Sequence, residues 1–558
     1  MDTIFSFDVF DTCLCRLCGE SRLLFEVLSL KVQKEWEYNE HMRQMFVMAR
    51  SEAYGSSLDE IYGNVAKSFP LPDSPKKMAQ MEMETEKQLV APIVSTRKLV
   101  DQLRKKGKIR YISDMYLPHS FIRERLVEHG FFRDGDELYV SDAVSGWKVD
   151  GSLFRYVHEK EKVSYRHWHH YGDNRHSDYV IPRQLGINAH HLYYDYLPYE
   201  EKWKTIPMLH CQWGRIFAGM ARAIRLSTEA EEDQKVFVTN LSAPFMVAWV
   251  LDIMKKAHQQ GVRRLYFCSR DMHTHFLVAK RLNVLFSDIE VRYLFISVKA
   301  RQFDETLLSN YLIQEGVLSS EQVALVDSNS SGNTLVTINS IARRRHFCPI
   351  LGYYITYYKS EESMSPRDED WQKLNYLKFS PYCDCVNSTA ADLLSHRVIV
   401  ELLFSLNYHD RTIGYEVHGD LIRPILQSDG EDDWHMSGDI RMAKRQNDMM
   451  AIAFADAFIS TCIYKFFKEI LYQLSIPTLL DFYNRPTKKY LTYLHRFFVG
   501  STPYVGCFFG NQKGIWKRGN LIFTLPDVLA SFVLLVLNNK MVHKFHRKAL
   551  KMIKRSKK

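Results

Sequence analysis

The chain has 558 residues, of which 46% are hydrophobic and 25% are charged, proportions that are typical of a globular protein and exclude a fibrous or disordered one. At this length we expect three or four domains of roughly 150 residues each. The formal net charge is +9, and the stretch from Lys540 to Lys558 alone carries nine basic and no acidic residues. The rest of the chain is therefore nearly neutral, which argues against binding of nucleic acid.

The ten cysteines show no spacing that is typical of a disulfide framework, so we expect free thiols and a reducing compartment. Cys13, Cys15 and Cys18 lie close together, but no second Cys or His pair follows at zinc-finger spacing, which disfavours a metal cluster. The chain starts without a basic and then apolar leader, so a signal peptide is not expected. These features predict a cytoplasmic protein.

The stretch Ile4–Thr12 predicts a buried first strand and a turn, and it carries Asp8, Asp11 and Thr12. An apolar strand that ends in carboxylates and a hydroxyl is typical of a parallel sheet, whose ligands bind at the carboxyl ends of the strands. From about residue 20 to 107, apolar residues recur at helical spacing, which predicts a helical insert.

Three later segments place polar residues at strand ends or in turns. The predicted strand 108–112 leads to Ser113, a turn-rich stretch contains Lys148, and the predicted strand 169–171 leads to Asp173 and Asp178. Phosphoryl transfer to a carboxylate needs this set: one Asp attacks, Mg²⁺ held by the other acids neutralises charge, and Lys with Ser or Thr holds the phosphoryl oxygens. The alternative is that these acids are turn and N-cap residues.

Residues 1–200 resemble the haloacid-dehalogenase-like (HAD) phosphatases, whose four motifs match Asp8 to Thr12, Ser113, Lys148, and Gly172-Asp173 with Asp178. The resemblance implies a doubly wound α/β domain with Asp8 as the nucleophile, and a cap formed by the insert at 20–107. It implies Mg²⁺ bound by Asp8, Asp173, Asp178 and the backbone carbonyl of Phe10.

One position departs from the pattern of that family. Phosphatases of this kind usually carry a second Asp as general acid and base two residues after the nucleophile, and Phe10 stands there instead. The proton for the leaving group must then come from Asp11 or a residue of the insert. A dehalogenase-like or non-hydrolytic role also stays open.

A second doubly wound domain is predicted at 201–360, with helices first and then strands at 265–268, 291–296, 323–326 and 351–356. The last of its polar loops follows Asp327 and opens a helix, so its backbone N–H groups and hydroxyls suit a phosphate. The loop resembles the phosphoribosyl-diphosphate (PRPP) loop of phosphoribosyltransferases, and its expected ligand residues are Asp327, Ser330, Ser331, Gly332, Asn333 and Thr334.

Neighbouring strand ends of this domain supply charge for a diphosphate and its metal. We expect Asp271 as general base or metal partner and Arg270, Lys299 and Arg301 as cations. The alternatives are an ordinary Ser/Gly turn at Asp327 and solvated basic residues on loops.

The pairing of the two domains resembles bacterial systems that install ribofuranose in surface polysaccharides such as O-antigens. It implies a bifunctional enzyme that transfers ribose 5-phosphate from PRPP to a glycan acceptor and then removes the 5-phosphate. The alternatives are a phosphatase whose second domain only binds a phosphorylated sugar or nucleotide, and a non-catalytic scaffold, which Phe10 favours.

The remaining region, 361–558, follows a polar linker and is predicted to be largely helical. Its most apolar run, Val528–Leu537, has ten residues, whereas spanning a bilayer takes about 20. With the basic tail after it, this run suits peripheral binding to an anionic membrane. We therefore expect a lipid-linked glycan acceptor at the cytoplasmic face of the inner membrane; the alternative is a core helix with a solubilising tail.

Overall fold

The computed structural model of the protein describes residues 3–144, 146–204, 210–330, 332–357, 374–376, 411–427 and 438–467. The chain divides into two units, which we describe separately. Unit 1 comprises Met1–Glu229 and Asp456–Phe466, and unit 2 comprises Ala230–Ala455 and Phe467–Lys558. The predicted linker at 360–366, the apolar run Val528–Leu537 and the basic tail lie outside the described residues.

Unit 1 is built on a five-stranded parallel sheet with the order β5-β4-β1-β6-β7. The first strand of the chain is therefore the central one, and both of its neighbours come from much later segments. The strands are β1 (Ile4–Phe7), β4 (Lys108–Ser113), β5 (Glu137–Val140), β6 (Trp168–Gly172) and β7 (Asn188–His191).

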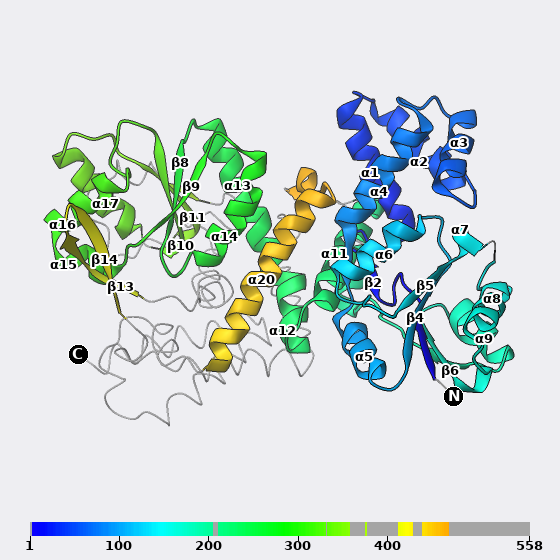
Figure 1. Ribbon diagram of the computed structural model, residues 1–558. Coiled ribbons are helices and arrows are strands. Elements are labelled where there is room, and N and C mark those ends of the chain that lie inside the picture. The colour runs from blue at the N-terminus through cyan, green and yellow to red at the C-terminus, as the bar shows by residue number, and fades with distance from the viewer. Residues whose placement is uncertain are drawn as a thin grey trace, which may run out of the picture. The chain divides into compact units, whose positions relative to one another are not determined.

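Alternate residues of the central strands face two different cores, because successive side chains of a strand point to opposite faces. Phe5, Phe7 and Tyr111 belong to one core, which α5 and α6 cover. Ile4 and Ile112 belong to the other, which α8 and α9 cover, so the sheet lies between two helical layers (Figure 1). These helices are α5 (Val94–Arg104), α6 (His119–Glu128), α8 (Ser152–Glu161) and α9 (Ile181–Gln184), with the short elements α7 (Ser141–Val144), η1 (Tyr165–His167) and η2 (Arg175–Val180) between them.

The segment after Thr12 is a helical insert that leaves and re-enters the sheet domain through an antiparallel pair of short strands, β2 and β3. Buried ion pairs hold it together: Arg50 binds Glu82 in a bidentate pair at 2.6 Å, and Arg16 of β2 donates to Glu86 at 2.7 Å. Tyr116, which follows β4, donates to Glu82 at 3.1 Å and so joins the insert to the sheet domain. The elements are β2 (Leu14–Arg16), α1 (Ser21–Glu35), α2 (Glu40–Glu52), α3 (Leu58–Ser68), α4 (Pro75–Leu89) and β3 (Val90–Pro92).

Two further helices, α10 (Pro198–Lys204) and α11 (His210–Ser227), belong to unit 1. Helix α11 passes very close to the loop after β2: a Cβ on Gly219 would lie 2.4 Å from the backbone nitrogen of Gly19. Gly19 itself has φ of +86°, a conformation that side chains disfavour. Glycine at both positions therefore allows α11 to pack directly on the loop that follows β2. The 3-10 turn η7 (Ile463–Phe466) completes the unit.

Unit 2 contains a second five-stranded parallel sheet, with the order β12-β11-β10-β8-β9. The mixed α/β class predicted from the sequence, with parallel sheets and many helices, is confirmed. The strands are β8 (Arg264–Cys268), β9 (Glu290–Leu294), β10 (Val323–Ser330), β11 (Leu351–Tyr357) and β12 (Leu374–Tyr376). The helices are α12 (Glu232–Phe237), η4 (Val238–Ser242), α13 (Ala243–Gln259), α14 (His273–Leu282), η5 (Asn283–Leu285), α15 (Val298–Phe303), α16 (Glu305–Gln314) and α17 (Asn333–Arg344).

Helix α13 lies in an apolar stretch, Gln234–Gln259, that is long and apolar enough to cross a membrane. Its most apolar window is completely buried inside the protein. Since a core helix has the same composition as a membrane span, burial of this kind accounts for the stretch.

Two features of unit 2 differ from the prediction. Strand β10 does not end at Val326 but continues through Ser330, because β11 extends with it and pairs Ser330 with Tyr357. The region after residue 360, predicted to be largely helical, contains a β-hairpin of β13 (Arg411–His418) and β14 (Leu421–Gln427) as well as the helix α20 (Gly438–Ser460). A two-residue turn with Gly419 at φ of +64° makes the hairpin possible.

Candidate active site

Asp8 lies at the carboxyl end of β1, where the chain leaves the centre of the sheet. Its backbone N–H donates to the carbonyl of Tyr171 on β6 at 2.8 Å, and its side chain is buried. Thr12, fully buried in the next turn, donates from Oγ1 to Asp173 Oδ1 at 3.3 Å and accepts from the N–H of Asp173 at 3.1 Å. Thr12 thus joins the loop after β1 to the loop after β6.

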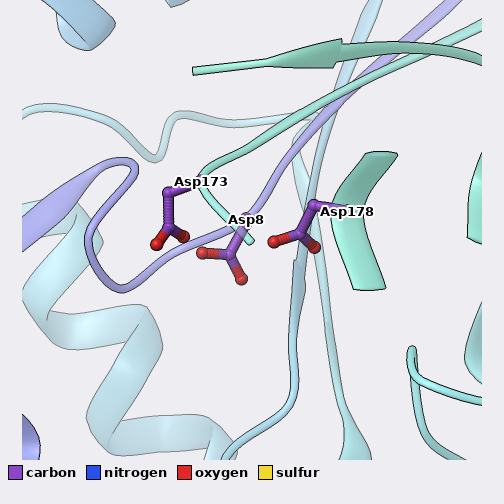
Figure 2. Close-up of side chains that lie close together, drawn as sticks. All are labelled: Asp8, Asp173 and Asp178. Carbon is purple, nitrogen blue, oxygen red and sulfur yellow. The ribbon is translucent and has the colours of Figure 1, made fainter. Parts of the chain in front are cut away.

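The carboxylates of Asp8, Asp173 and Asp178 gather at this edge of the sheet. Each offers an oxygen, and these oxygens all lie within 4.8 Å of one another. Figure 2 shows Asp8 between the other two side chains. Among the residues that the structure describes, this is the one group of His, Cys, Asp and Glu close enough to hold a metal ion.

Lys148 enters the same cluster from the loop after β5. Its Nζ donates to Asp8 Oδ1 at 2.5 Å and to Asp178 Oδ1 at 2.6 Å, and all three side chains are buried. The Lys148 backbone N–H donates to both oxygens of Asp114, at 3.0 and 2.9 Å. Asp114 therefore fixes the loop that presents the ammonium group.

Burial and charge set the protonation of these groups. Burial raises the pKa of Asp8 well above its ordinary value, although the Lys148 ammonium opposes this shift. Burial together with the Asp11 and Asp178 carboxylates raises the pKa of Asp173 to about 6. For Asp178, burial would raise the pKa, but the Lys148 ammonium and a hydrogen bond from His170 hold it well below its ordinary value. Burial would lower the pKa of Lys148, but Asp178 and Asp8 raise it above its ordinary value, so they favour the ammonium form.

Phe10 stands where related phosphatases carry their general acid, and Asp11 is the candidate to replace it. Both residues contact an arginine. The guanidinium of Arg16 lies over the Phe10 ring, 4.3 Å from its centroid. Asp11 has φ of +56°, and its Oδ1 accepts from Arg222 Nη1 of α11 at 3.1 Å. Asp11 is thus paired as an anion with a cation contributed by a distant helix.

Of the residues predicted for this site, Asp8, Thr12, Lys148, Asp173 and Asp178 are in direct contact with one another or within the acid cluster. Ser113 is buried at the end of the adjacent strand β4. No role was predicted for Asp114, His170 or Arg222. His170 stands beside His169 in β6, so no local pattern indicates it, and none indicates Arg222.

The neighbouring cysteines are part of the core. Cys13, Cys15 and Cys18 are free and buried, and burial raises the pKa of Cys13 well above its ordinary value and that of Cys15 to about 12. Thiols in this state are poor nucleophiles and poor metal ligands.

The residues predicted in unit 2 are brought together only in part. Cys268 is the last residue of β8. Burial raises the pKa of its thiol, and the carboxylates of Asp327 and Asp271 raise it further. Both acids therefore lie near the end of β8. Burial lowers the pKa of Arg301, an effect that Asp327 opposes, and Arg301 Nη1 donates to Thr337 of α17 at 3.1 Å. The charges of Asp271, Arg301 and Asp327 therefore act on groups near the carboxyl end of β8.

The other predicted residues of unit 2 have different surroundings. Arg270, with φ of +66°, pairs with Asp271 at 2.8 Å, whereas Lys299 donates to Gln427 of β14 at 3.2 Å. Ser330 belongs to β10 and not to a turn, and Ser331 lies outside the described residues. Gly332, with φ of +77°, caps α17, Asn333 and Thr334 form its first turn, and Thr334 is buried.

Comparison with known proteins gives similar solved structures but no sequence family. No protein-family model matches the chain, and no curated protein matches it. A HAD-type hydrolase from Bacillus subtilis with bound magnesium is 17% identical, with 33% of this chain and 86% of that chain covered and a TM-score of 0.26. A HAD phosphatase from Thermococcus onnurineus is 18% identical, with 35% and 87% covered and a TM-score of 0.27. A HAD-family enzyme from Bacteroides thetaiotaomicron in complex with magnesium and inorganic phosphate is 13% identical, with 34% and 94% covered and a TM-score of 0.26.

Proposed function

We propose that unit 1 is a Mg²⁺-dependent phosphatase that uses Asp8 as its nucleophile. The observation that carries this proposal is the position of Asp8: a buried carboxylate at the end of the central strand, bound by Lys148 and flanked by Asp173 and Asp178. A buried group of three acids with one lysine has little use as a structural core, because each charge costs free energy to bury. It suits a site that binds cations and phosphoryl oxygens.

The donor set fits magnesium. Mg²⁺ prefers oxygen ligands and one or two carboxylates with substrate phosphate, and the cluster offers three carboxylates close together. Asp8 and Asp173 would bind the ion, with Asp178 beside them and the backbone carbonyl of Phe10 as the further ligand that the resemblance implies. When bound, the ion would neutralise charge on the transferring phosphoryl group.

The residues of the chain then have the following roles. A carboxylate oxygen of Asp8 attacks phosphorus, the bond from phosphorus to the leaving oxygen breaks, and an aspartyl phosphate forms on Asp8 while the leaving oxygen takes a proton from solvent water. Lys148 and Ser113 hold the phosphoryl oxygens, and the fixed ammonium stabilises their charge in the transition state. Water then attacks the same phosphorus, which releases phosphate and restores the Asp8 carboxylate. Asp11, paired with Arg222, is an anion suited to accept the proton of that water.

Asp8→Asn tests the proposal directly. The variant should lose hydrolysis of p-nitrophenyl phosphate by about 10³-fold or more, since the nucleophile is removed, and wild-type activity should require Mg²⁺ and stop on addition of EDTA. Asp150→Asn, in an exposed turn near Lys148, is the matched control and should retain full activity. Equal activity of Asp8→Asn and wild type would overturn the proposal.

For unit 2 we propose a phosphoribosyl transfer site, which would make the protein a bifunctional enzyme that installs ribofuranose in a bacterial surface polysaccharide. The charges of Asp271, Arg301 and Asp327 near the end of β8 support a site for a phosphorylated ligand. The runner-up is a unit that only binds a phosphorylated sugar or nucleotide. Release of diphosphate from PRPP upon addition of a glycan acceptor supports transfer, and binding of PRPP without release supports the runner-up.

The left-handed backbone at Gly332 allows a specific variant. Gly332→Val should block close approach of a phosphate to the first turn of α17, so unchanged PRPP affinity would contradict this site. In Asp8→Asn, transfer should continue and the product should retain its 5-phosphate.

The proposed setting is the cytoplasmic face of the inner membrane, where a lipid-linked glycan would be the acceptor. The nine basic residues from Lys540 to Lys558 support this proposal by their charge. Removal of residues after Asn539 should reduce sedimentation with anionic liposomes at low salt and leave hydrolysis of p-nitrophenyl phosphate unchanged.

A further inference from the structure

Three polar side chains form a buried chain of hydrogen bonds beneath the acid cluster. Trp168 Nε1 donates to Ser6 Oγ at 2.7 Å, Ser6 Oγ lies 2.8 Å from His170 Nδ1, and His170 Nε2 lies 3.2 Å from Asp178 Oδ1. All four side chains are buried. Ser6 and His170 are directly opposite each other in the register of β1 and β6, so the sheet itself holds the chain together.

The positions of the hydrogens follow from what each group can donate. Asp178, ionised by Lys148, can only accept, so His170 Nε2 must carry a hydrogen. The indole of Trp168 can only donate, so Ser6 Oγ accepts from it and has its own hydrogen left to give. The acceptor at normal distance is His170 Nδ1, at 2.8 Å, whereas the alternative, the carbonyl of His169, is at 3.4 Å.

The ring of His170 is also held by packing. The Phe154 ring of α8 meets it edge to face, with centroids 4.9 Å apart. A second positive charge on His170 would lie beside the Lys148 ammonium, which binds the same oxygen of Asp178. A neutral ring with hydrogen on Nε2 therefore satisfies every partner.

Asp178 accepts hydrogen bonds at both oxygens. Oδ1 accepts from Lys148 and His170, and Oδ2 accepts from the backbone N–H of Asn174 at 3.1 Å. Lys148 contacts Asp8 too and comes from the loop before α8, whereas His170 belongs to the strand β6 of the sheet. His170 is thus the side chain of the sheet that fixes the rotation of the Asp178 carboxylate.

We propose that His170 is a positioning residue of the cation site, held as its Nε2–H tautomer by Trp168 and Ser6 so that it orients Asp178 toward Lys148 and a divalent cation. Partners of this kind, which orient the ligands of a metal, commonly change metal affinity by 10- to 100-fold. The inference rests on the proposed cation site, but it does not require that the bound cation serve a phosphatase.

The variants separate orientation from packing. His170→Phe keeps a ring and removes both nitrogens, and it should weaken Mg²⁺ binding, measured by calorimetry, by about 10- to 100-fold. His170→Gln retains an N–H donor at the place of Nε2 and should recover most of that affinity. His169→Phe is the matched control: it is the adjacent residue of β6, on the opposite face, where its ring contacts His190 at 3.1 Å. It should bind Mg²⁺ like wild type.

The tautomer can be measured on the wild-type protein, and a variant is needed only to assign the signal of His170. In ¹⁵N NMR of histidine-labelled protein, with the His170 signal assigned by its absence in His170→Gln, Nε2 should be protonated and Nδ1 should not. Hydrogen on Nδ1 would overturn the proposal. So would Mg²⁺ affinity in His170→Phe equal to that of wild type, whereas loss of phosphatase activity in Asp8→Asn has no bearing on either result.

Discussion

Arg222 of α11 and Asp11, which are 211 positions apart in the sequence, form a hydrogen-bonded ion pair at 3.1 Å beside the proposed nucleophile. The guanidinium is buried and also donates from Nε to the carbonyl of Tyr194 at 2.8 Å. After burial, the Asp11 carboxylate has the largest effect in raising the pKa of Asp173. Through its ion pair with Asp11, helix α11 thus acts on the electrostatics of the cation site.

Removal of this guanidinium should make the cation site more sensitive to acid. In Arg222→Met, the carboxylate of Asp11 is left without its partner, and its repulsion of Asp173 raises the pKa of Asp173 further. We expect the pH below which Mg²⁺ affinity falls, measured by calorimetry from pH 5 to 8, to be higher than in wild type. Arg215→Met is the control: Arg215 lies on the same helix as Arg222, and its exposed ion pair is with Glu20, the residue before α1. If both variants raised this pH equally, the effect would come from the packing of α11 and not from the pair.

Lys148→Met should show that a bound cation can partly replace the ammonium group in stabilising the buried carboxylates. Without Lys148, Asp8 and Asp178 are buried carboxylates with no cation between them, which should cost about 3 to 5 kcal/mol in magnesium-free buffer. The loss, measured by urea denaturation, should become smaller when Mg²⁺ is added, because binding to the folded state stabilises it. The double variant Lys148→Met/Asp178→Asn should regain part of the stability without Mg²⁺. A loss that does not change with Mg²⁺ would contradict the shared role.

Magnesium affinity should depend on pH in a window set by Asp173. Its pKa of about 6 in the folded protein lies above the ordinary 3.8, so the carboxyl is protonated at pH 5 and the cation must displace a proton. The apparent affinity should therefore be constant above about pH 7 and fall as the pH drops through 6, by up to about tenfold per unit.

Asp11→Asn provides the control for this pH dependence. It removes a carboxylate that raises the pKa of Asp173, so the fall in affinity should begin at a lower pH than in wild type. Calorimetric titrations from pH 5 to 8 measure both proteins, and affinity that stays constant over that range in wild type would show that Asp173 does not bind the cation.

His275 should make unit 2 sensitive to acid. It is completely buried in α14, with the Trp249 ring edge to face at 5.3 Å, and burial lowers its pKa from 6.5 to about 3. Because the unfolded chain binds a proton more readily, stability is complete above pH 6.5 and is lost as the pH falls, by up to about 1.4 kcal/mol per unit. This loss should continue down to about pH 3.

His275→Leu removes the titrating group and should flatten the free energy of unfolding between pH 6 and 4.5, as measured by urea denaturation followed by tryptophan fluorescence. His258→Gln changes an exposed histidine and should leave the slope of wild type intact. An identical slope in wild type and His275→Leu would assign the acid sensitivity to other groups.

Site residues could be predicted from the sequence where polar residues directly follow the apolar run of a strand. Asp8, Asp173 and Lys148 each follow or lie near an apolar run, and a parallel sheet necessarily brings the carboxyl ends of its strands to one edge. Arg222 could not be predicted in this way, because its place depends on the packing of a whole helix through Gly219. His170 and Ser6 were hidden for another reason: two polar residues within strands have no meaning until the register of β1 and β6 pairs them.

In unit 2 the strands could be predicted from the sequence, but the end of one strand and the contacts of two basic residues could not. Its parallel sheet was predictable from apolar runs, but the end of β10 was not, since the strand continues only because β11 pairs with it as far as Ser330. Lys299 and Arg301 follow the same predicted strand, so both are expected at one ligand site. Lys299 instead contacts Gln427, whereas Arg301 contacts Thr337. Positions two apart on one short helix can point to different neighbours, and sequence spacing alone does not say which.

The close packing of Gly219 on Gly19 has a consequence for protein synthesis. Arg222 and the helix that carries it leave the ribosome about two hundred residues after the nucleophile loop. A nascent chain that has emerged only as far as β7 has its acids and lysine but lacks the partner of Asp11. The surroundings of Asp11 are therefore completed only when α11 emerges and docks.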